Sequence, residues 1–220
     1  MTASAKLRFT ISMSLDGFVA GPIESVENPL GIGGERLHDW VVPLAAWRAP
    51  HGYEGGEVNE STPVFEESLA NIGATLMGRG MFGGAPGPWN ANHPWNGWWG
   101  DNPPFHHPVF VLTHHTREPL ALEGGTTFTF VTNGIEAALE LAMTAAGGKD
   151  VALLGGASTA QQYLVADLVD EMEISLVPTL LGGGKRLFDS VGANLHGLDL
   201  VRTIATPKVT HFKFARHGRD

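Results

Sequence analysis

The stretch Val151–Gly184 reads VALLGGASTAQQYLVADLVDEMEISLVPTLLGGG and decides how the chain is interpreted. Its first four residues are a short apolar run of strand type, which Gly155 and Gly156 end. Helical composition follows over residues 157–166, and residues 170–181 are expected to form a second strand that ends at a run of three glycines. The stretch therefore predicts a strand, a helix and another strand with short connections.

The glycine pair in this stretch is a candidate phosphate site. A strand that ends at Gly155-Gly156 and turns at once into a helix leaves backbone N–H groups exposed at the helix N-terminus, where anions bind. Ser158 and Thr159 add hydroxyl donors in the first turn. A full Gly-x-Gly-x-x-Gly fingerprint is absent, so a tight turn that needs small residues for packing remains the alternative.

Outside this stretch, alternating and apolar runs predict further strands and helices. Strands are expected at Leu7–Ser14, Ala74–Met77, Val109–Thr113 and Thr127–Thr132, helices at Glu35–Trp47, Thr62–Ile72 and Ile135–Ala146, and a terminal hairpin at Leu198–Ala205 and Val209–Arg216. Thr62 is expected as the N-cap of its helix, with Pro63 in the first position. The order predicts an α/β fold with a mixed, mostly parallel sheet and an antiparallel edge. We expect one domain over residues 1–220, with loop insertions at about 24–60 and 83–107.

Composition excludes several classes of protein. The formal net charge of −9 argues against a nucleic-acid partner, and the absence of cysteine excludes disulfides, thiolate nucleophiles and cysteine zinc sites. The ten histidines show no metal-ligand spacing, so no metal is expected. No apolar run is long enough to span a membrane, and the N-terminus lacks a signal-peptide core, so a cytoplasmic protein is expected.

Polar residues follow several of the expected strands, where ligands bind in open α/β sheets. Arg79, directly after a buried strand, is a candidate anion clamp or a surface ion-pair partner. Thr113 and His114 are candidates for a phosphate or a ribose, or are simply a polar strand exit. Asp16 is a candidate proton donor or substrate ligand, although turn aspartates more often cap a turn.

The loop at 83–107 contains four tryptophans, Trp89, Trp95, Trp98 and Trp99, among many Gly, Pro and Asn residues. Such a loop either closes over a flat aromatic ligand or packs against a second subunit.

Five motifs occur in an order that is similar to one protein family. They are SMSLDG at 12–17, LMGR at 76–79, VFVLT at 109–113, LGGA at 154–157, and LVDE at 168–171 followed by VPTLLGGG at 177–184. The order resembles the RibD C-terminal, dihydrofolate-reductase-like family over nearly the whole chain. The resemblance implies a dihydrofolate-reductase-like three-layer sandwich, NADPH as hydride donor and a homodimer.

The resemblance also implies roles for individual residues. It places the 2′-phosphate at Gly78 and Arg79, the adenosine at Thr113 and His114, the pyrophosphate at Gly155, Gly156, Ala157, Ser158 and Thr159, and the nicotinamide at Ile11, Ser12 and Gly21. The substrate is expected beside Asp16, under Trp98 and Trp99, with His38 or Asp39 assisting proton transfer. Riboflavin reductases of the family tend to carry lysine where Thr10 stands, which leaves the substrate open.

Together these features predict an NADPH-dependent reductase that transfers hydride to a C=N or C=O bond of a small, flat substrate, pteridine- or pyrimidine-like. A nucleotide-binding protein without turnover is the first alternative. A structural dimerisation module, which predicts no affinity for nucleotides, is the second.

Overall fold

The computed structural model describes residues 5–84, 86–92, 94–192 and 197–217. Its strands are β1 (Leu7–Ser14), β2 (Phe18–Ala20), β3 (Ile72–Gly78), β4 (Pro108–Leu112), β5 (Leu120–Ala121), β6 (Thr127–Val131), β7 (Asp150–Leu153), β8 (Glu171–Val177), β9 (Lys185–Arg186), β10 (Leu198–Ala205) and β11 (Thr210–Arg216). Its helices are α1 (Ala45–Arg48), α2 (Thr62–Leu69), α3 (Arg79–Phe82), α4 (Ile135–Ala146) and α5 (Ala157–Val165), with 3-10 turns η1 (Gly34–His38), η2 (Ala49–His51) and η3 (Glu123–Gly125). No helix in this part of the chain is long and apolar enough to cross a membrane.

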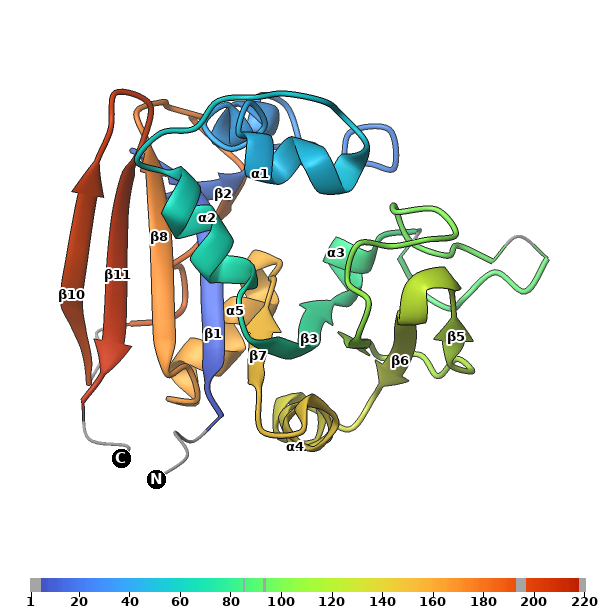
Figure 1. The fold of residues 1–220 in the computed structure, drawn as a ribbon. Coiled ribbons are helices and arrows are strands. Elements are labelled where there is room, and N and C mark those ends of the chain that lie inside the picture. The colour runs from blue at the N-terminus through green and yellow to red at the C-terminus, as the bar shows by residue number, and fades with distance from the viewer. Residues whose placement is uncertain (1–4, 85, 93, 193–196, 218–220) are drawn as a thin grey trace.

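Within the described residues, nine strands form one mixed sheet in the order β10-β11-β8-β1-β7-β3-β4-β6-β5 (Figure 1). The run from β8 to β6 is parallel throughout, and β11, β10 and β5 add antiparallel edges. The predicted fold class is therefore confirmed, including the C-terminal hairpin. Because the parallel strands run in one direction, their carboxyl ends meet along one edge of the sheet, where a ligand is expected.

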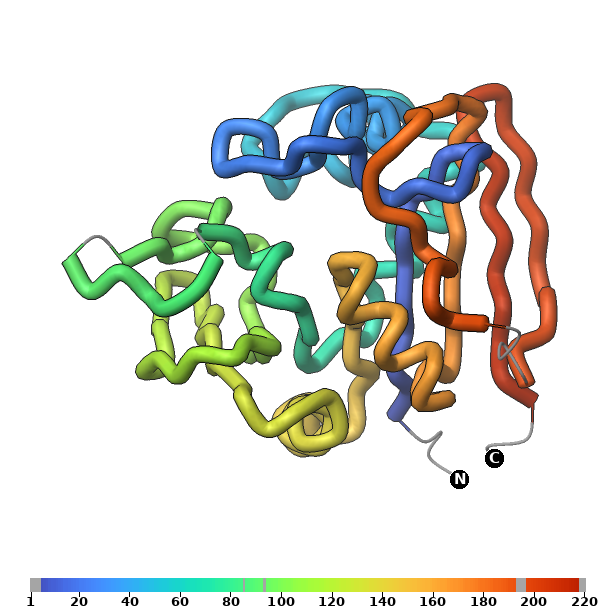
Figure 2. The backbone as a smooth tube through the Cα atoms, turned by 180° about the vertical axis from the view of Figure 1, so that it is seen from behind, coloured from blue at the N-terminus to red at the C-terminus, as the bar shows by residue number. Residues whose placement is uncertain are grey.

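Helices cover both faces of this sheet. Figure 1 shows α2 in front of β8 and β1, and Figure 2 shows α5 on the opposite face. On that second face, the buried Tyr163 hydroxyl of α5 donates a 2.9 Å hydrogen bond to the Ile135 carbonyl of α4. Ala138 and Ala142 of α4 belong to the same core cluster as Ala160 of α5. Small residues on both helices thus allow close packing onto the sheet.

The segment before α2 differs from the prediction. Residues 35–47 were expected to form one helix, but they form η1, a series of turns, and the start of α1. Pro43 has no N–H group to continue a helix, and Leu44 adopts extended backbone angles (φ −66°, ψ 135°). The expected helix at Thr62–Ile72 also ends early, at Leu69, and Ser61 rather than Thr62 is its N-cap residue.

Other boundaries lie close to the prediction. β1, α4 and β10 have the expected bounds, whereas β8 ends at Val177 instead of residue 181. Pro178 has no N–H for the ladder, and the residues after it form the loop that leads to β9. The short strands β2, β5 and β9 were not expected, because two or three residues carry no periodicity. The expected domain, residues 1–220, extends beyond the described residues at both ends.

Candidate active site

A cavity of about 550 Å³ lies at the carboxyl ends of the parallel strands. It brings together most residues that were predicted to bind the cofactor: Ile11, Ser12, Arg79, Thr113, His114, Gly156, Ala157, Ser158 and Thr159. They come from β1, α3, the end of β4 and the N-terminus of α5. We refer to it below as the cofactor cavity, because backbone N–H groups and hydroxyls at a helix N-terminus suit a phosphate.

The three other glycines of that prediction, Gly21, Gly78 and Gly155, are not among the described residues that line the cavity. A Cβ atom at Gly78 would lie 2.2 Å from Thr159 Oγ1, and one at Gly21 would lie 2.1 Å from the Ile32 carbonyl oxygen. The Gly155 carbonyl accepts a 2.7 Å hydrogen bond from Gly78 N–H. Gly78 and Gly21 therefore permit close packing beside the cavity, whereas Gly155 has the positive φ of 100° that favours glycine.

Arg79 lies in the cofactor cavity beside a tryptophan. Its guanidinium donates to the Gly83 carbonyl, and its central carbon lies 3.5 Å from the centroid of the Trp89 ring. The Arg117 guanidinium lies 5.0 Å from the same ring. Burial lowers the pKa of Arg79, and the positive charge of Arg117 lowers it further. An anion beside Arg79 would offset the burial and the repulsion that lower its pKa.

A second cavity of about 830 Å³ adjoins the first on the face of the sheet that carries α2. Five residues line both cavities: Ile11, Ser12, His38, Met81 and Leu154. Aromatic side chains from two regions wall the second cavity, with Trp40 and Trp47 on one side and Phe105 on the other. We call it the substrate cavity and the five residues the shared wall.

His38 of η1 is the predicted catalytic residue that the structure places at the shared wall. Burial lowers the pKa of its imidazole, with the Gly34 hydrogen bond and the Asp39 charge opposing the shift. Its Nδ1 atom is buried and has no hydrogen-bond partner among the described residues. Asp39 is exposed and lines neither cavity, so the two are not brought together into one site.

Asp16 is hydrogen-bonded within the turns that follow β1 and β8. Its carboxylate accepts hydrogen bonds from Ser14 Oγ at 2.6 Å, Gly182 N–H at 2.8 Å and Leu181 N–H at 3.2 Å. The Ser14 bond is the largest cause that lowers the pKa of Asp16 to about 2, and the two backbone bonds act in the same direction. Asp16 is not among the described residues lining either cavity. It ties the β1–β2 turn to the loop before β9.

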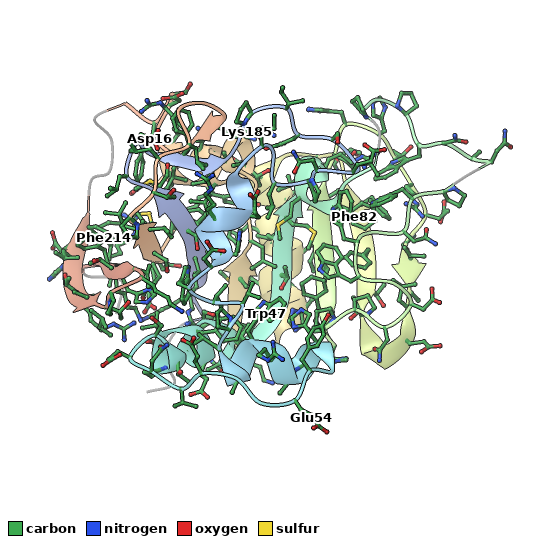
Figure 3. The ribbon with its side chains drawn as sticks, turned by 90° about the horizontal axis from the view of Figure 1, so that it is seen from above. Asp16, Trp47, Glu54, Phe82, Lys185 and Phe214 are labelled. Atoms are coloured by element: carbon green, nitrogen blue, oxygen red, sulfur yellow. The ribbon has the colours of Figure 1, made fainter. Side chains whose placement is uncertain are left out.

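Trp98 and Trp99 were predicted to cover the substrate, but neither is among the described residues lining a cavity. Trp98 Nε1 donates to the Met81 carbonyl at 2.9 Å, and Trp99 packs edge-on against Phe105, with ring centroids 4.9 Å apart. Trp89, Trp95 and Trp99 pack against Phe82 and Phe128 in a separate aromatic core (Figure 3 labels Phe82). The predicted contact of Trp98 and Trp99 with the substrate stays a prediction.

Sequence reasoning missed a polar row that crosses three strands. Ser12 of β1, Ser175 of β8 and His211 of β11 are direct register partners. His211 is fully buried, and its ring nitrogens lie 2.9 Å from Ser175 Oγ and 2.9 Å from Ser61 Oγ. Burial, aided by Arg202, lowers the pKa of His211 to about 4, so the ring is neutral near neutral pH.

Trp40 lies over this row. Its Nε1 donates to Ser12 Oγ at 3.0 Å, and its ring meets His211 edge-on, with centroids 4.8 Å apart. Trp40, which lines the substrate cavity, thus fixes the hydroxyl of Ser12, a residue of the shared wall. No local motif signals this arrangement, because Trp40, Ser175 and His211 are distant in sequence.

Several solved structures have a fold similar to that of this chain. A putative riboflavin biosynthesis protein from Shewanella sp. PV-4 superposes with a TM-score of 0.61 and 21% identity, covering 97% of this chain and 99% of that chain. The diaminohydroxyphosphoribosylaminopyrimidine deaminase/5-amino-6-(5-phosphoribosylamino)uracil reductase of Thermotoga maritima gives a TM-score of 0.56 at 11% identity, and RibD of Acinetobacter baumannii gives 0.56 at 14%. This chain is covered to 97% and 98% in these two matches but spans only 57% and 59% of those longer chains.

No curated protein matches the sequence significantly. The family described as the RibD C-terminal domain matches residues 5–212, nearly the whole chain. The chain therefore belongs to the RibD C-terminal domain family.

Proposed function

We propose that this protein is an NADPH-dependent reductase of a C=N or C=O bond in a small, flat heterocyclic substrate. One observation carries the proposal: a cavity suited to a dinucleotide and a second, larger cavity share the wall formed by Ile11, Ser12, His38, Met81 and Leu154. Hydride transfer requires donor and acceptor rings in contact, which a shared wall allows. Membership of the RibD C-terminal domain family supports the same reaction type.

In this proposal, NADPH supplies the hydride, and the chain binds and orients both molecules. The N-terminus of α5, with Ser158 and Thr159, binds the diphosphate, and Arg79 binds the 2′-phosphate. Trp40 and Trp47 provide apolar surface for a flat ring. His38, at the shared wall, is the residue placed to hold or deliver a proton.

The substrate cavity also favours an acidic substituent on the substrate. Its described lining residues include no carboxylate, and the permanent cations among them are Arg8 and Lys149. Arg8 is already paired with Asp150 and Glu171, whereas Lys149 is exposed at the cavity rim. Basic lining is notable in a chain whose formal net charge is −9.

The test has two steps. NADPH is titrated into the protein, and binding separates a reductase or a nucleotide-binding protein from a structural dimerisation module. Loss of NADPH absorbance is then followed with a panel of heterocyclic compounds that carry a reducible C=N or C=O bond, including dihydrofolate and phosphoribosylamino-uracils. Turnover supports the reductase, whereas tight binding without turnover on the panel favours the nucleotide-binding protein.

A homodimer is also proposed. β10 is an edge strand of the sheet, and Leu200 and Val201 on it are each 53% exposed. Unpaired edges with apolar side chains favour pairing with a second copy. Sedimentation equilibrium tests this assignment, and a monomer at all concentrations contradicts it.

A further inference from the structure

The segment after the three-glycine run contributes Lys185 to the lining of the cofactor cavity. Residues 182–184 lead into β9, which pairs with β2 through Ala20↔Lys185 and Phe18↔Arg186. A Cβ atom at Gly184 (φ 119°) would lie 2.0 Å from the Ala20 carbonyl oxygen, so a side chain there would push the two strands apart. The carboxylate of Asp16 holds the start of this segment through Gly182 N–H. The segment is therefore fixed in place, and it presents Lys185.

Lys185 faces a carboxylate from another loop. Its Nζ pairs with Glu24 Oε2, and both residues line the cofactor cavity. The Lys185 side chain is 54% exposed and that of Glu24 27% exposed. Exposed ion pairs of this kind contribute little to stability. Replacing Glu24 by another anion as the partner of Lys185 therefore costs little free energy.

The neighbours of this pair suit a phosphate. Gln161 of α5 donates from Nε2 to the Arg186 carbonyl at 2.9 Å, which ties β9 to the helix whose N-terminus lines the cavity. Among the described lining residues, Arg79 and Lys185 are the permanent cations and Glu24 is the carboxylate. Arg79 follows β3, whereas Lys185 is the register partner of Ala20 in β2. Figure 3 shows Lys185 and Asp16 at this end of the molecule.

We propose that Lys185 binds the diphosphate of the cofactor and that Glu24 competes with the cofactor for this lysine. The inference rests on the proposed function, since it takes NADPH as the ligand. It adds a phosphate ligand that lies outside the glycine-rich turn. It also assigns Glu24 the role of a residue that weakens cofactor binding.

Dissociation constants for NADPH and NADH test the proposal in the full chain, at low and high ionic strength. Both cofactors carry the diphosphate, so Lys185→Gln should weaken both by a similar factor, about ten-fold, and Lys185→Arg should restore most of the loss. Glu24→Gln should strengthen both by about three-fold or more, and this gain should shrink in the double variant. Lys208→Gln and Glu57→Gln alter another exposed ion pair, which lines neither cavity, and should change nothing.

Three results would overturn the proposal. Unchanged affinity in Lys185→Gln removes the lysine from the site. Equal weakening in Glu24→Gln and Lys185→Gln shows that the pair only supports the cavity wall. A loss confined to NADPH assigns Lys185 to the 2′-phosphate instead. If the unaltered protein binds neither cofactor, the proposed function itself fails, which is a distinct result.

Discussion

The guanidinium carbon of Arg79 lies 3.5 Å from the centre of the Trp89 ring, and Arg117 approaches the same ring at 5.0 Å. Both guanidinium groups contact the same ring, and Arg79 is the one of the two that lines the cofactor cavity. A cation fixed over an aromatic face loses less freedom when an anion binds.

Arg79→Ala should therefore weaken NADPH and spare NADH, because the two cofactors differ only by the 2′-phosphate. A charge-assisted hydrogen bond contributes about 1.5–3 kcal/mol, which corresponds to about ten- to a hundred-fold in affinity. The dissociation constants of both cofactors check this, and the salt dependence for NADPH should flatten. Equal losses for the two cofactors would mean that Arg79 supports the fold.

His38→Gln should lower turnover about ten-fold or more and leave the dissociation constant of NADPH within about two-fold. Because burial lowers the pKa of His38, little of it is protonated near pH 7. If it donates the proton, turnover in the unaltered enzyme rises as the solution becomes more acidic than the ordinary pKa of histidine, because burial lowers the pKa of His38. His217→Gln is the matched control, since the exposed His217 lines neither cavity. A pH profile that is the same in His38→Gln and in the unaltered enzyme argues against proton transfer by His38.

Asp16→Asn should act on stability before it acts on chemistry. The asparagine cannot accept all three hydrogen bonds that the carboxylate accepts, so the free energy of unfolding falls. Asp16 has a lowered pKa of about 2, so its contribution is present above its ordinary pKa near 3.8 and is lost as pH falls toward 2. Urea unfolding of both chains at several pH values measures the difference, which should shrink over this acid range. Asp39→Asn, at an exposed carboxylate, is the control.

His211→Phe should destabilise the protein by about 1–3 kcal/mol, because Ser61 and Ser175 lose their shared partner while remaining buried. The folded state holds His211 neutral with a pKa of about 4, so the unfolded chain binds the extra proton between pH 6.5 and 4. The unaltered chain should thus lose stability as pH falls through this window, and the variant should lose less. Parallel curves for the two chains would contradict the buried neutral imidazole.

Trp99→Ala should cost about 2–4 kcal/mol of stability and leave NADPH affinity nearly unchanged, because Trp99 packs in the aromatic core with Phe105 and Phe128. Thermal unfolding and cofactor titration measure the two effects. Trp40→Phe should instead lower turnover, since Trp40 lines the substrate cavity and donates a hydrogen bond to Ser12. A strong loss of NADPH affinity in Trp99→Ala would return this tryptophan to the site.

The parts of the site that were predictable are local in sequence. Gly155-Gly156 and the helix after it indicate, within a few residues, the turn that lines the cofactor cavity, and Arg79 directly follows a strand. The role of Asp16 was not predictable, because its partners Leu181 and Gly182 lie about 165 residues further along the chain.

The same holds for His211, whose partner Ser61 is 150 residues away in sequence. The helix expected at 35–47 failed for a local reason, since Pro43 and the extended Leu44 divide it. The sequence did not show that Trp89, Trp95 and Trp99 pack in an aromatic core, because large rings can fill a core as well as cover a ligand. Periodicity finds elements, whereas burial of polar side chains depends on partners brought together by the fold.

The shared wall has a consequence for redesign. A residue reached from one side only, such as Thr159 in the cofactor cavity or Phe65 in the substrate cavity, can be varied to suit one ligand alone. Ile11 and Met81 line both cavities, so a larger side chain at either position reduces the volume available to the cofactor and to the substrate. Libraries that aim to change the substrate should begin with Phe65 and keep Ile11 and Met81 constant until cofactor affinity has been secured.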